Sequence, residues 1–292
     1  MILITGATGK IGSRLVKQLS EAGVQVRALV RNPDKAATLK APNVEIVTGD
    51  LNQPVTLDAA LREVERLFLL PPNTRNQAEM ENNLFQAAKL ASIGHVVKLS
   101  TVKADINSPS HFFKEHWLAE KHLRRSGIPF TILQSNSFMQ NLLWFALEIK
   151  SEGRFSIPMK DAQTAPVDIR DIVSVAAAVL TEKNHEGRTY NITGPEALSF
   201  KEVAEKLSVA TGKKITYNSV SLEDFKKILA RGGPQGWLAD ALVAAWKVAS
   251  EGHPTVTNVV SEVAKKEPIT FKQFAQDYAH VFESESPNLD IT

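Results

Sequence analysis

Residues 1–19 read MILITGATGKIGSRLVKQL, an apolar run followed by a turn with Gly6, Gly9 and Gly12 and then by a helical pattern. A strand, a glycine-rich turn and a helix in this order bring backbone N–H groups and a helix N-terminus to one point, where they can bind a diphosphate. Gly6 would permit the tight turn, Gly9 the close approach of the phosphates, and Gly12 the packing of the helix against the strand. An ordinary strand-to-helix turn is the alternative, but this context favours a dinucleotide site.

The pattern of the opening stretch repeats along the first half of the chain. Short apolar runs occur at residues 1–5, 24–30, 43–49, 66–70, 95–100 and 130–134. Helical patterns separate them, over residues 11–22, 33–40, 54–62, 76–92 and 110–126. Apolar strands spaced by helices are typical of a parallel sheet that is covered on both faces. The sequence therefore predicts an α/β fold with a doubly wound parallel Rossmann sheet.

The regular alternation of strands and helices ends after Gln134, where helical patterns outnumber strands. We expect helices over residues 138–150, 169–181, 199–211, 221–231, 235–251 and 270–282, the last with Thr270 as its N-cap. A loop over residues 152–168 and one short strand at 188–193 complete this part. We therefore expect a Rossmann core at residues 1–135 that also uses about 165–193, and a smaller, mostly helical substrate lobe at 136–164 and 194–292. A ligand would bind in the cleft between the two.

Composition narrows the functions that the chain can have. The formal net charge of +2 is small and the basic residues are scattered, so the basic stripe of a nucleic-acid-binding protein is missing. The chain has no cysteine, which excludes disulfides, thiolate metal ligands and cysteine nucleophiles, and we expect no metal site. An apolar strand from residue 2 leaves no room for a signal peptide, and no apolar run reaches the length of a membrane span. We expect a cytoplasmic protein that binds neither nucleic acid nor membrane.

The residue at the end of the second predicted strand distinguishes NAD from NADP. A carboxylate there binds the ribose 2′-hydroxyl of NAD, whereas an arginine accommodates the 2′-phosphate of NADP. Here the strand ends in Arg31, which indicates NADP(H), with a solvated loop arginine as the alternative. Lys10 and Lys35 could belong to the same pocket. Asp50 closes the third strand, where it either reaches the adenine or bonds its own turn.

Five segments of the chain resemble one known group of proteins. They read TGATGKIG, ALVRNPDKA, GDLNQP, HVVKLS and EHWLAEKHLRRSGIPFTILQSNSFMQN. These segments are similar to the NmrA-like type of atypical short-chain dehydrogenase/reductase, in particular to the branch with NADPH-dependent quinone oxidoreductase and triphenylmethane reductase. The resemblance covers residues 1 to about 195 well and the C-terminal part loosely. It implies an NADP(H)-binding Rossmann domain with a small substrate lobe.

The resemblance also assigns cofactor positions residue by residue. The positions that match the diphosphate loop are Thr8, Gly9, Lys10 and Ile11. The remaining matches are Arg31 for the 2′-phosphate site, Asp50 and Leu51 for the adenine site, and Leu70 and Pro71 for the segment beneath the ribose. Asp171, in the segment VDIRDI, is expected to be a helix N-cap rather than a catalytic group.

One family feature is missing from the predicted helix at 110–126. Many short-chain dehydrogenases use a Tyr-x-x-x-Lys pair, in which the lysine and the nicotinamide ribose acidify a tyrosine that donates a proton. When the segments are aligned on EKHL, the tyrosine position holds Phe112 and the lysine position holds His116. Tyrosine-based carbonyl reduction is therefore not expected. With an ordinary pKa of about 6.5, His116 could donate the proton at neutral pH. Alternatively, it could only orient the nicotinamide ribose or form a hydrogen bond within the helix layer.

Polar and aromatic residues follow the fifth and sixth predicted strands. Ser100 matches a family serine that often contacts the cofactor or the substrate, and a local turn hydrogen bond is the alternative. Gln134 stands where relatives often carry arginine, so Asn136 and Phe138 are expected to approach the nicotinamide and the substrate. A set of nearby apolar residues forms either a wall for an aromatic acceptor or part of the core: Phe138, Met139, Trp144 and Phe155.

Two functions compete at this point. The first is an NADPH-dependent reductase that transfers hydride to a small-molecule electron acceptor such as a quinone, an azo dye or another conjugated electrophile, which needs little help from an acid. The second is a non-enzymatic sensor that binds NADP(H) and reports its redox state to a protein partner. We favour the reductase and expect a monomer or a homodimer. Epimerisation of a sugar nucleotide is less favoured, because it usually needs the missing tyrosine.

Overall fold

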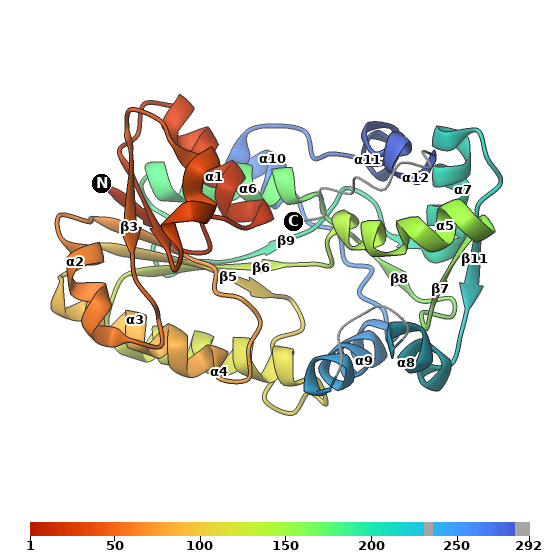
Figure 1. Ribbon diagram of the computed structural model, residues 1–292, viewed down its shortest axis with the longest axis horizontal. Helices are drawn as coiled ribbons and strands as arrows, with labels where there is room; N and C mark the ends of the chain where they lie inside the picture. The colour runs from red at the N-terminus through yellow and green to blue at the C-terminus, as the bar shows by residue number, and fades with distance from the viewer. Residues whose placement is uncertain (231–235, 284–292) are drawn as a thin grey trace.

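The computed structural model describes residues 1–230 and 236–283, and its centre is a seven-stranded parallel sheet (Figure 1). The strand order is β3-β2-β1-β4-β5-β6-β9, and every neighbouring pair runs parallel. The strands are β1 (Ile2–Ile4), β2 (Val26–Val30), β3 (Val44–Thr48), β4 (Arg66–Leu69), β5 (His95–Thr101), β6 (Phe130–Ser135) and β9 (Thr189–Ile192). The order reverses between β1 and β4, which opens a crevice at the carboxyl ends of these strands. The predicted doubly wound Rossmann sheet is confirmed.

Helices cover both faces of this sheet (Figure 1). On one face lie α1 (Lys10–Glu21), α6 (Ile169–Thr181) and α10 (Val259–Ala264), and on the other α2 (Leu57–Leu61), α3 (Gln77–Leu90) and α4 (His111–Ser126). Strand residues alternate between two apolar cores, since Ile2 and Ile4 pack under the first set of helices and Leu3 packs under the second. α10 covers the sheet although it falls within the range 194–292 that the sequence assigns to the substrate lobe.

Three predicted helices differ in form from the expectation. Residues 33–39 form a 3-10 helix, η1 (Pro33–Leu39), residues 54–61 divide into η2 (Pro54–Thr56) and α2, and residues 139–152 divide into η3 (Met139–Phe145) and α5 (Ala146–Glu152). Proline starts both η1 and η2, and the side chain of Asn32 caps η1 by accepting from the Asp34 N–H at 2.9 Å. Segments this short are held by their surroundings rather than by helix propensity, so their type is hard to predict.

A second group of elements extends from the carboxyl end of the sheet (Figure 1). β7 (Arg154–Ile157) pairs in parallel with β11 (Thr216–Ser219), and β8 (Gln163–Thr164) pairs antiparallel with β10 (Leu198–Ser199). The predicted loop at 152–168 is therefore wrong in two places, because both strands pair with residues far along the chain. The remaining helices are α7 (Phe200–Thr211), α8 (Leu222–Ala230), α9 (Trp237–Ala249), α11 (Phe271–Asp277) and α12 (Ala279–Glu283). The predicted helix ends at 231 and 235 lie outside the described residues.

A third apolar core holds this second group together. At its centre are five fully buried phenylalanines, Phe155, Phe225, Phe271, Phe274 and Phe282. The helix predicted over 270–282 is two helices with Tyr278 between them, and both place phenylalanines in this core. Among the described helices, none combines the length and the apolar character that a membrane crossing requires.

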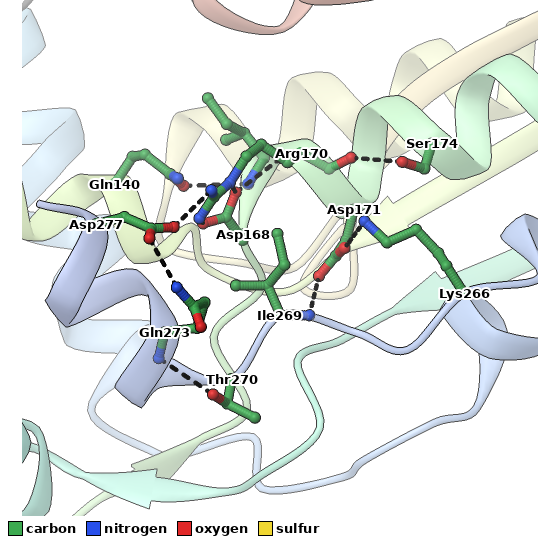
Figure 2. A network of polar contacts seen from close by, with 11 residues as sticks. Gln140, Asp168, Arg170, Asp171, Ser174, Lys266, Ile269, Thr270, Gln273 and Asp277 are labelled. Carbon is green, nitrogen blue, oxygen red and sulfur yellow. Dashed lines mark hydrogen bonds and ion pairs between the residues drawn. The ribbon is translucent and has the colours of Figure 1, made fainter.

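The N-terminus of α6 joins the sheet to the second group (Figure 2). Asp168 caps α6 by accepting from the Arg170 N–H at 2.8 Å, and the Arg170 guanidinium pairs with Asp168 at 2.8 Å and with Asp277 of α11 at 2.6 Å. Asp171 is not the N-cap that the resemblance suggested. It is fully buried in the first turn, where it accepts from the Ile269 N–H and pairs with Lys266, each at 2.8 Å. The predicted bounds of 169–181 already place Asp168 before the helix and Asp171 inside its first turn, and the structure agrees.

The N-cap predicted for the last helical region is confirmed. Thr270 precedes α11, and its Oγ1 accepts from the Gln273 N–H at 3.2 Å (Figure 2).

Candidate functional site

A cavity of about 730 Å³ opens where the carboxyl ends of the central strands meet the second group of elements. All residues predicted for the site except Gly12 line it, namely Gly6, Thr8, Gly9, Lys10, Ile11, Arg31, Asp50, Leu51, Leu70, Pro71, Ser100, His116, Asn136 and Phe138. They come from the ends of six different strands and from α1 and α4, and the parallel sheet brings them to one edge.

The three glycines of the first turn have different surroundings. Gly6 has a φ of +59°, and a Cβ on it would lie 2.3 Å from the carbonyl oxygen of Leu70. A Cβ on Gly12 would lie 2.1 Å from the carbonyl oxygen of Gly6. Gly9 is exposed to the cavity, and a Cβ there would find its nearest neighbour at 3.2 Å. The fold therefore requires glycine at 6 and 12, whereas a side chain at 9 would occupy space that belongs to the cavity.

The N-terminus of α1 opens into the same space. Gly9 is the N-cap and supplies no side-chain oxygen, and the first turn contains no acidic residue. The first N–H groups of a helix lack partners within the helix, and their partial positive charge attracts anions. Lys10 also lines this end of the cavity, where burial lowers the pKa of its ammonium group and Arg14 lowers it further. The residues present therefore suit a phosphate or a diphosphate.

The ends of β2 and β3 form the next part of the wall. Arg31 follows β2 directly and lines the cavity with an exposed side chain, whereas Lys35 in η1 does not line it. Asp50 Oδ1 accepts from the Asn52 N–H at 2.9 Å, so the turn hydrogen bond that competed with a ligand role is present. Asp50 nevertheless lines the cavity as well.

The segment after β4 lies beside the glycine turn. The Leu70 N–H donates to Thr5 Oγ1 at 2.8 Å, which fixes this segment against the end of β1. Leu70 and Pro71 both line the cavity, next to the carbonyl oxygen that excludes a side chain at Gly6.

His116 and Phe112 lie one turn apart on α4, and both line the cavity. His116 Nδ1 is 3.3 Å from Nε2 of Gln77 on α3. Burial lowers the pKa of His116 well below its ordinary value, and the ammonium group of Lys98 lowers it further. The ring is therefore neutral at pH 7. This corrects the ordinary pKa assumed from the sequence and removes the imidazolium as a proton donor at neutral pH.

Ser100 is tied to α4 rather than to its own turn. Its Oγ donates to Glu120 Oε1 at 2.6 Å, and Nε2 of Gln134 donates to the same oxygen at 2.9 Å. Arg124 lies 3.6 Å from the other oxygen of this carboxylate. The local turn bond considered for Ser100 is therefore wrong. Its hydroxyl hydrogen is engaged by Glu120 although the residue lines the cavity.

Asn136 and Phe138 follow β6 and face the second group of elements. Asn136 is buried, and its Nδ2 donates to the carbonyl oxygen of His253 at 3.2 Å. Of the four residues considered for an aromatic wall, Phe138 and Trp144 line the cavity. Met139 and Phe155 belong instead to the third core, because η3 and β7 turn their side chains inward.

Several lining residues were not predicted from the sequence. One wall is a face of α9 at helical spacing, with Leu242, Ala245, Trp246 and Ala249. Lys103 and His253 line the cavity near this wall, and Lys103 Nζ donates to the carbonyl oxygen of Gly252 at 2.9 Å. The apolar face of α9 is visible in the sequence, but its spacing does not say which cavity it borders.

Known proteins resemble this chain over nearly its whole length. The model of the NmrA-like family matches residues 1–275. An NAD(P)H azoreductase from Xenophilus azovorans is 38% identical over 285 residues, which cover 97% of this chain and 99% of that protein. The structure of the NADPH-dependent quinone oxidoreductase of Escherichia coli in complex with NADPH has a TM-score of 0.88 at 31% identity, with 95% of this chain and 99% of that chain covered. The triphenylmethane reductase of a Citrobacter species complexed with NADP(H) has a TM-score of 0.84 at 28% identity, over 95% and 99% of the two chains.

Proposed function

The chain belongs to the NmrA-like family and is an oxidoreductase that uses NADP(H), and we propose that its electron acceptor is a flat, conjugated small molecule such as a quinone or an azo compound. The observation that carries the proposal is the set of residues that line the cavity of about 730 Å³. A glycine turn and an uncapped helix N-terminus border one end, and aromatic side chains border the other.

The residues present fit the dinucleotide. Gly9 leaves the space that a side chain would fill, and α1 directs unpartnered N–H groups there. We assign the diphosphate to Thr8, Gly9, Lys10 and Ile11, the 2′-phosphate to Arg31, the adenine to Asp50 and Leu51, and the ribose to Leu70, Pro71 and Ser100. When bound, NADPH supplies a hydride from its nicotinamide ring. Gly6 and Gly12 act indirectly, by allowing the turn and the helix to pack closely.

The acceptor would bind against the second group of elements. We propose this group, within residues 136–164 and 194–292 but without α10, as the substrate lobe. Phe138, Trp144 and Trp246 offer aromatic surfaces that stack on a flat conjugated ring. Asn136 adds a polar group beside them, although its amide is already bonded to the carbonyl oxygen of His253.

The proposed chemistry needs no acidic tyrosine. One NADPH and one proton reduce a quinone to a hydroquinone, with the hydride carrying both electrons. Such an acceptor is electrophilic enough to take hydride without prior protonation, so Phe112 at the tyrosine position is no obstacle. We assign to His116 the contact with the acceptor.

A redox sensor would also bind NADP(H) but would not oxidise it with a small molecule. The relatives at 31–38% identity that match nearly the whole chain are named as reductases, which supports turnover over sensing.

The test is the loss of NADPH absorbance with purified protein and a panel of quinones, azo dyes and triphenylmethane dyes. We expect oxidation above the protein-free rate with at least one class, and slower oxidation with NADH. Gly9→Val should remove the activity without unfolding the protein. A wild-type protein that binds NADPH but oxidises it no faster than the blank with every acceptor would contradict the proposal and favour the sensor.

A further inference from the structure

A line of buried polar side chains runs from β5 to His116 beneath the cavity. Lys98 on β5 pairs with Glu81 on α3 at 2.6 Å between Nζ and Oε2, and neither side chain has any exposed surface. Gln77, one turn before Glu81 and also fully buried, donates from Nε2 to Glu81 Oε1 at 2.9 Å. The same nitrogen lies 3.3 Å from His116 Nδ1. His116, at the end of this line, faces the cavity.

From this line we infer that Gln77 is a positioning residue which, anchored by Glu81 and Lys98, holds His116 in the Nε2–H tautomer, so that the ring serves the acceptor as a neutral hydrogen-bond donor. The inference rests on the proposed function, and it narrows the substrate class to acceptors in which an oxygen or nitrogen atom gains negative charge on reduction.

The proton positions follow from what each group can donate. Lys98 occupies Glu81 Oε2, so Oε1 remains as the acceptor and Gln77 must present its nitrogen to it. An amide nitrogen has two hydrogens, and the second is left for His116 Nδ1. A ring nitrogen that accepts a hydrogen bond carries no proton. A neutral imidazole then has its proton on Nε2, the nitrogen that Gln77 does not contact.

The charged groups around His116 are compatible with a neutral ring. On α3, Glu81 is engaged by Lys98, and burial raises the pKa of Glu81 while that pairing opposes the rise. On α4, Glu115 is turned towards α3, where it accepts from the Ala78 N–H at 2.8 Å. Glu120, also on α4, is engaged by Ser100 and Gln134. These contacts leave the Lys98 ammonium as the neighbour that, after burial, lowers the pKa of His116.

Stability alone does not account for this arrangement. Removing two charges from water costs about as much as their attraction returns, and apolar side chains of similar size are often equally stable in such positions. Val96, two residues before Lys98 on the same face of β5, is an ordinary core residue. An ion pair at Lys98 therefore indicates a function for the two charges. Lys98 holds Glu81 in place, and Glu81 in turn orients Gln77.

A neutral donor suits an acceptor that takes hydride before it takes a proton. The hydride adds one hydrogen and two electrons, and negative charge appears on a quinone oxygen or an azo nitrogen. Nε2–H donates a hydrogen bond to that atom as the charge forms, which lowers the barrier without transferring the ring proton. Water supplies the proton that completes the product. His116 is therefore ready for the next turnover without being reprotonated.

Nitrogen NMR of protein labelled with ¹⁵N in its histidine rings tests the tautomer directly, without an acceptor. We expect His116, assigned by comparison with His116→Gln, to have a protonated Nε2 and an unprotonated Nδ1 from pH 6 to pH 8. A protonated Nδ1 in the wild-type protein would overturn the inference, whether or not the protein reduces any acceptor. The expected tautomer in a protein that reduces no acceptor would support the role of Gln77 and count against the proposed function.

A kinetic test separates positioning from general stability. Gln77→Leu keeps the size of the side chain but removes the amide, so the fixed tautomer should be lost. We expect kcat to fall roughly 10- to 100-fold, by analogy with the loss seen when hydrogen-bond partners that orient metal-binding histidines are removed. The KM for NADPH should not change. The matched control is Gln86→Leu, which alters an exposed glutamine of the same helix and should leave kcat unchanged. A folded Gln77→Leu protein with unchanged tautomer and kcat contradicts the inference. If this variant does not fold, the histidine NMR spectrum of the wild-type protein still tests the inference.

Discussion

A Cβ on Gly6 or Gly12 would lie within 2.3 Å of a carbonyl oxygen of the protein, whereas one on Gly9 would meet nothing closer than 3.2 Å. Gly6 and Gly12 are thus required by the packing of the fold, whereas Gly9 leaves space free in the cavity. Their spacing between a strand and a helix is enough to predict the turn. It does not predict the contact of Gly6 with Leu70, which comes from the end of another strand.

Gly9→Val should abolish NADPH binding and leave the apo protein folded, because the new side chain fills cavity space and its Cβ has one tight contact, at 3.2 Å with the Gly6 carbonyl oxygen, which a small shift of the turn relieves. Fluorescence titration with NADPH and thermal unfolding of the apo protein measure the two effects. Gly12→Ala is the matched control and should lower stability instead, since its Cβ is directed at the Gly6 carbonyl. Normal NADPH affinity in folded Gly9→Val would rule out a diphosphate at this turn.

Arg31→Ala should weaken NADPH binding roughly 10- to 150-fold and leave NADH binding nearly unchanged, because charge-assisted hydrogen bonds contribute about 1.5–3 kcal/mol and NADH has no 2′-phosphate. Calorimetric titration of both cofactors measures the difference, which should shrink as salt is added. Lys35→Ala, a nearby cation outside the cavity, should affect neither. An equal loss of affinity for NADPH and NADH would show that Arg31 does not bind the 2′-phosphate.

The position of His116 in the site can be predicted from its sequence, but its charge state cannot. Its pKa depends on burial and on the charge of Lys98, which lies on β5 rather than on α4. Ser100 is a similar case, because the carboxylate that engages its hydroxyl lies on α4.

At the scale of the elements, α6 is held in place by residues from distant parts of the chain. Its cap, Asp168, and the arginine beside it connect it to α11, while Asp171 binds the segment before α11 (Figure 2). The helix itself is predictable from its apolar periodicity, and its bounds match the expectation. β7 and β8 are not predictable in this way, because each is a short strand whose partner is known only once the chain has folded.

Asp168→Ala should lower the free energy of unfolding by about 1–2 kcal/mol, since it removes the N-cap of α6 and the buried partner of Arg170. Urea unfolding followed by circular dichroism measures this change. Asp277→Ala removes only the more exposed partner of Arg170 and should cost less than about 1 kcal/mol. Equal costs for the two variants would show that the cap contributes nothing of its own.

His95, at the start of β5, should make stability depend on pH. Its ring is buried against Thr131 of β6, 2.8 Å from Nε2 to Oγ1, and burial lowers its pKa from 6.5 to about 4. Between these two values the unfolded chain binds a proton that the folded protein does not, so stability falls as the pH falls through that range.

We expect the loss between pH 7 and pH 4.5 to be smaller in His95→Gln than in the wild type by about 2–3 kcal/mol, the part of this pKa shift that is realised within that pH range. Urea unfolding at the two pH values measures it. Identical losses in both proteins would mean that the pKa of His95 is not shifted by folding.

On the scale of the whole molecule, the cavity depends on a contact between α9 and α4. The ring of Trp237 lies edge-on to Phe112 at 6.1 Å and to His111 at 6.0 Å, and the Arg75 guanidinium is 5.3 Å from the same ring. The sequence predicts two lobes and a cleft between them. It does not predict that α9 closes one side of that cleft, because a local sequence pattern does not show which helices pack against each other.

Trp237→Ala should raise the KM for the acceptor roughly 2- to 12-fold, since each aromatic pair is worth about 0.5–1.5 kcal/mol and α9 carries part of the acceptor wall. The dissociation constant of NADPH should change less, because the proposed cofactor residues lie on the sheet side. Steady-state kinetics and an NADPH titration compare the two. Trp117→Ala, on the same α4 but outside the cavity, should leave the KM unchanged. A KM that is unchanged in Trp237→Ala would show that this contact does not shape the acceptor site.

The place of α6 and β9 in the chain has a consequence for synthesis. During translation, the first six strands of the sheet leave the ribosome well before residues 169–192. At that stage the nascent chain contains α1 but not α6, the helix that packs beside it. The outer edge of β6 also lacks its partner, β9. Exposed apolar surface and an open strand edge are the features that lead to aggregation and that chaperones bind. Residues 136–164, which lie outside the sheet, must be translated before the last strand, β9, can complete it. Polypeptides that end before residue 192 should therefore form insoluble fragments rather than a smaller folded domain.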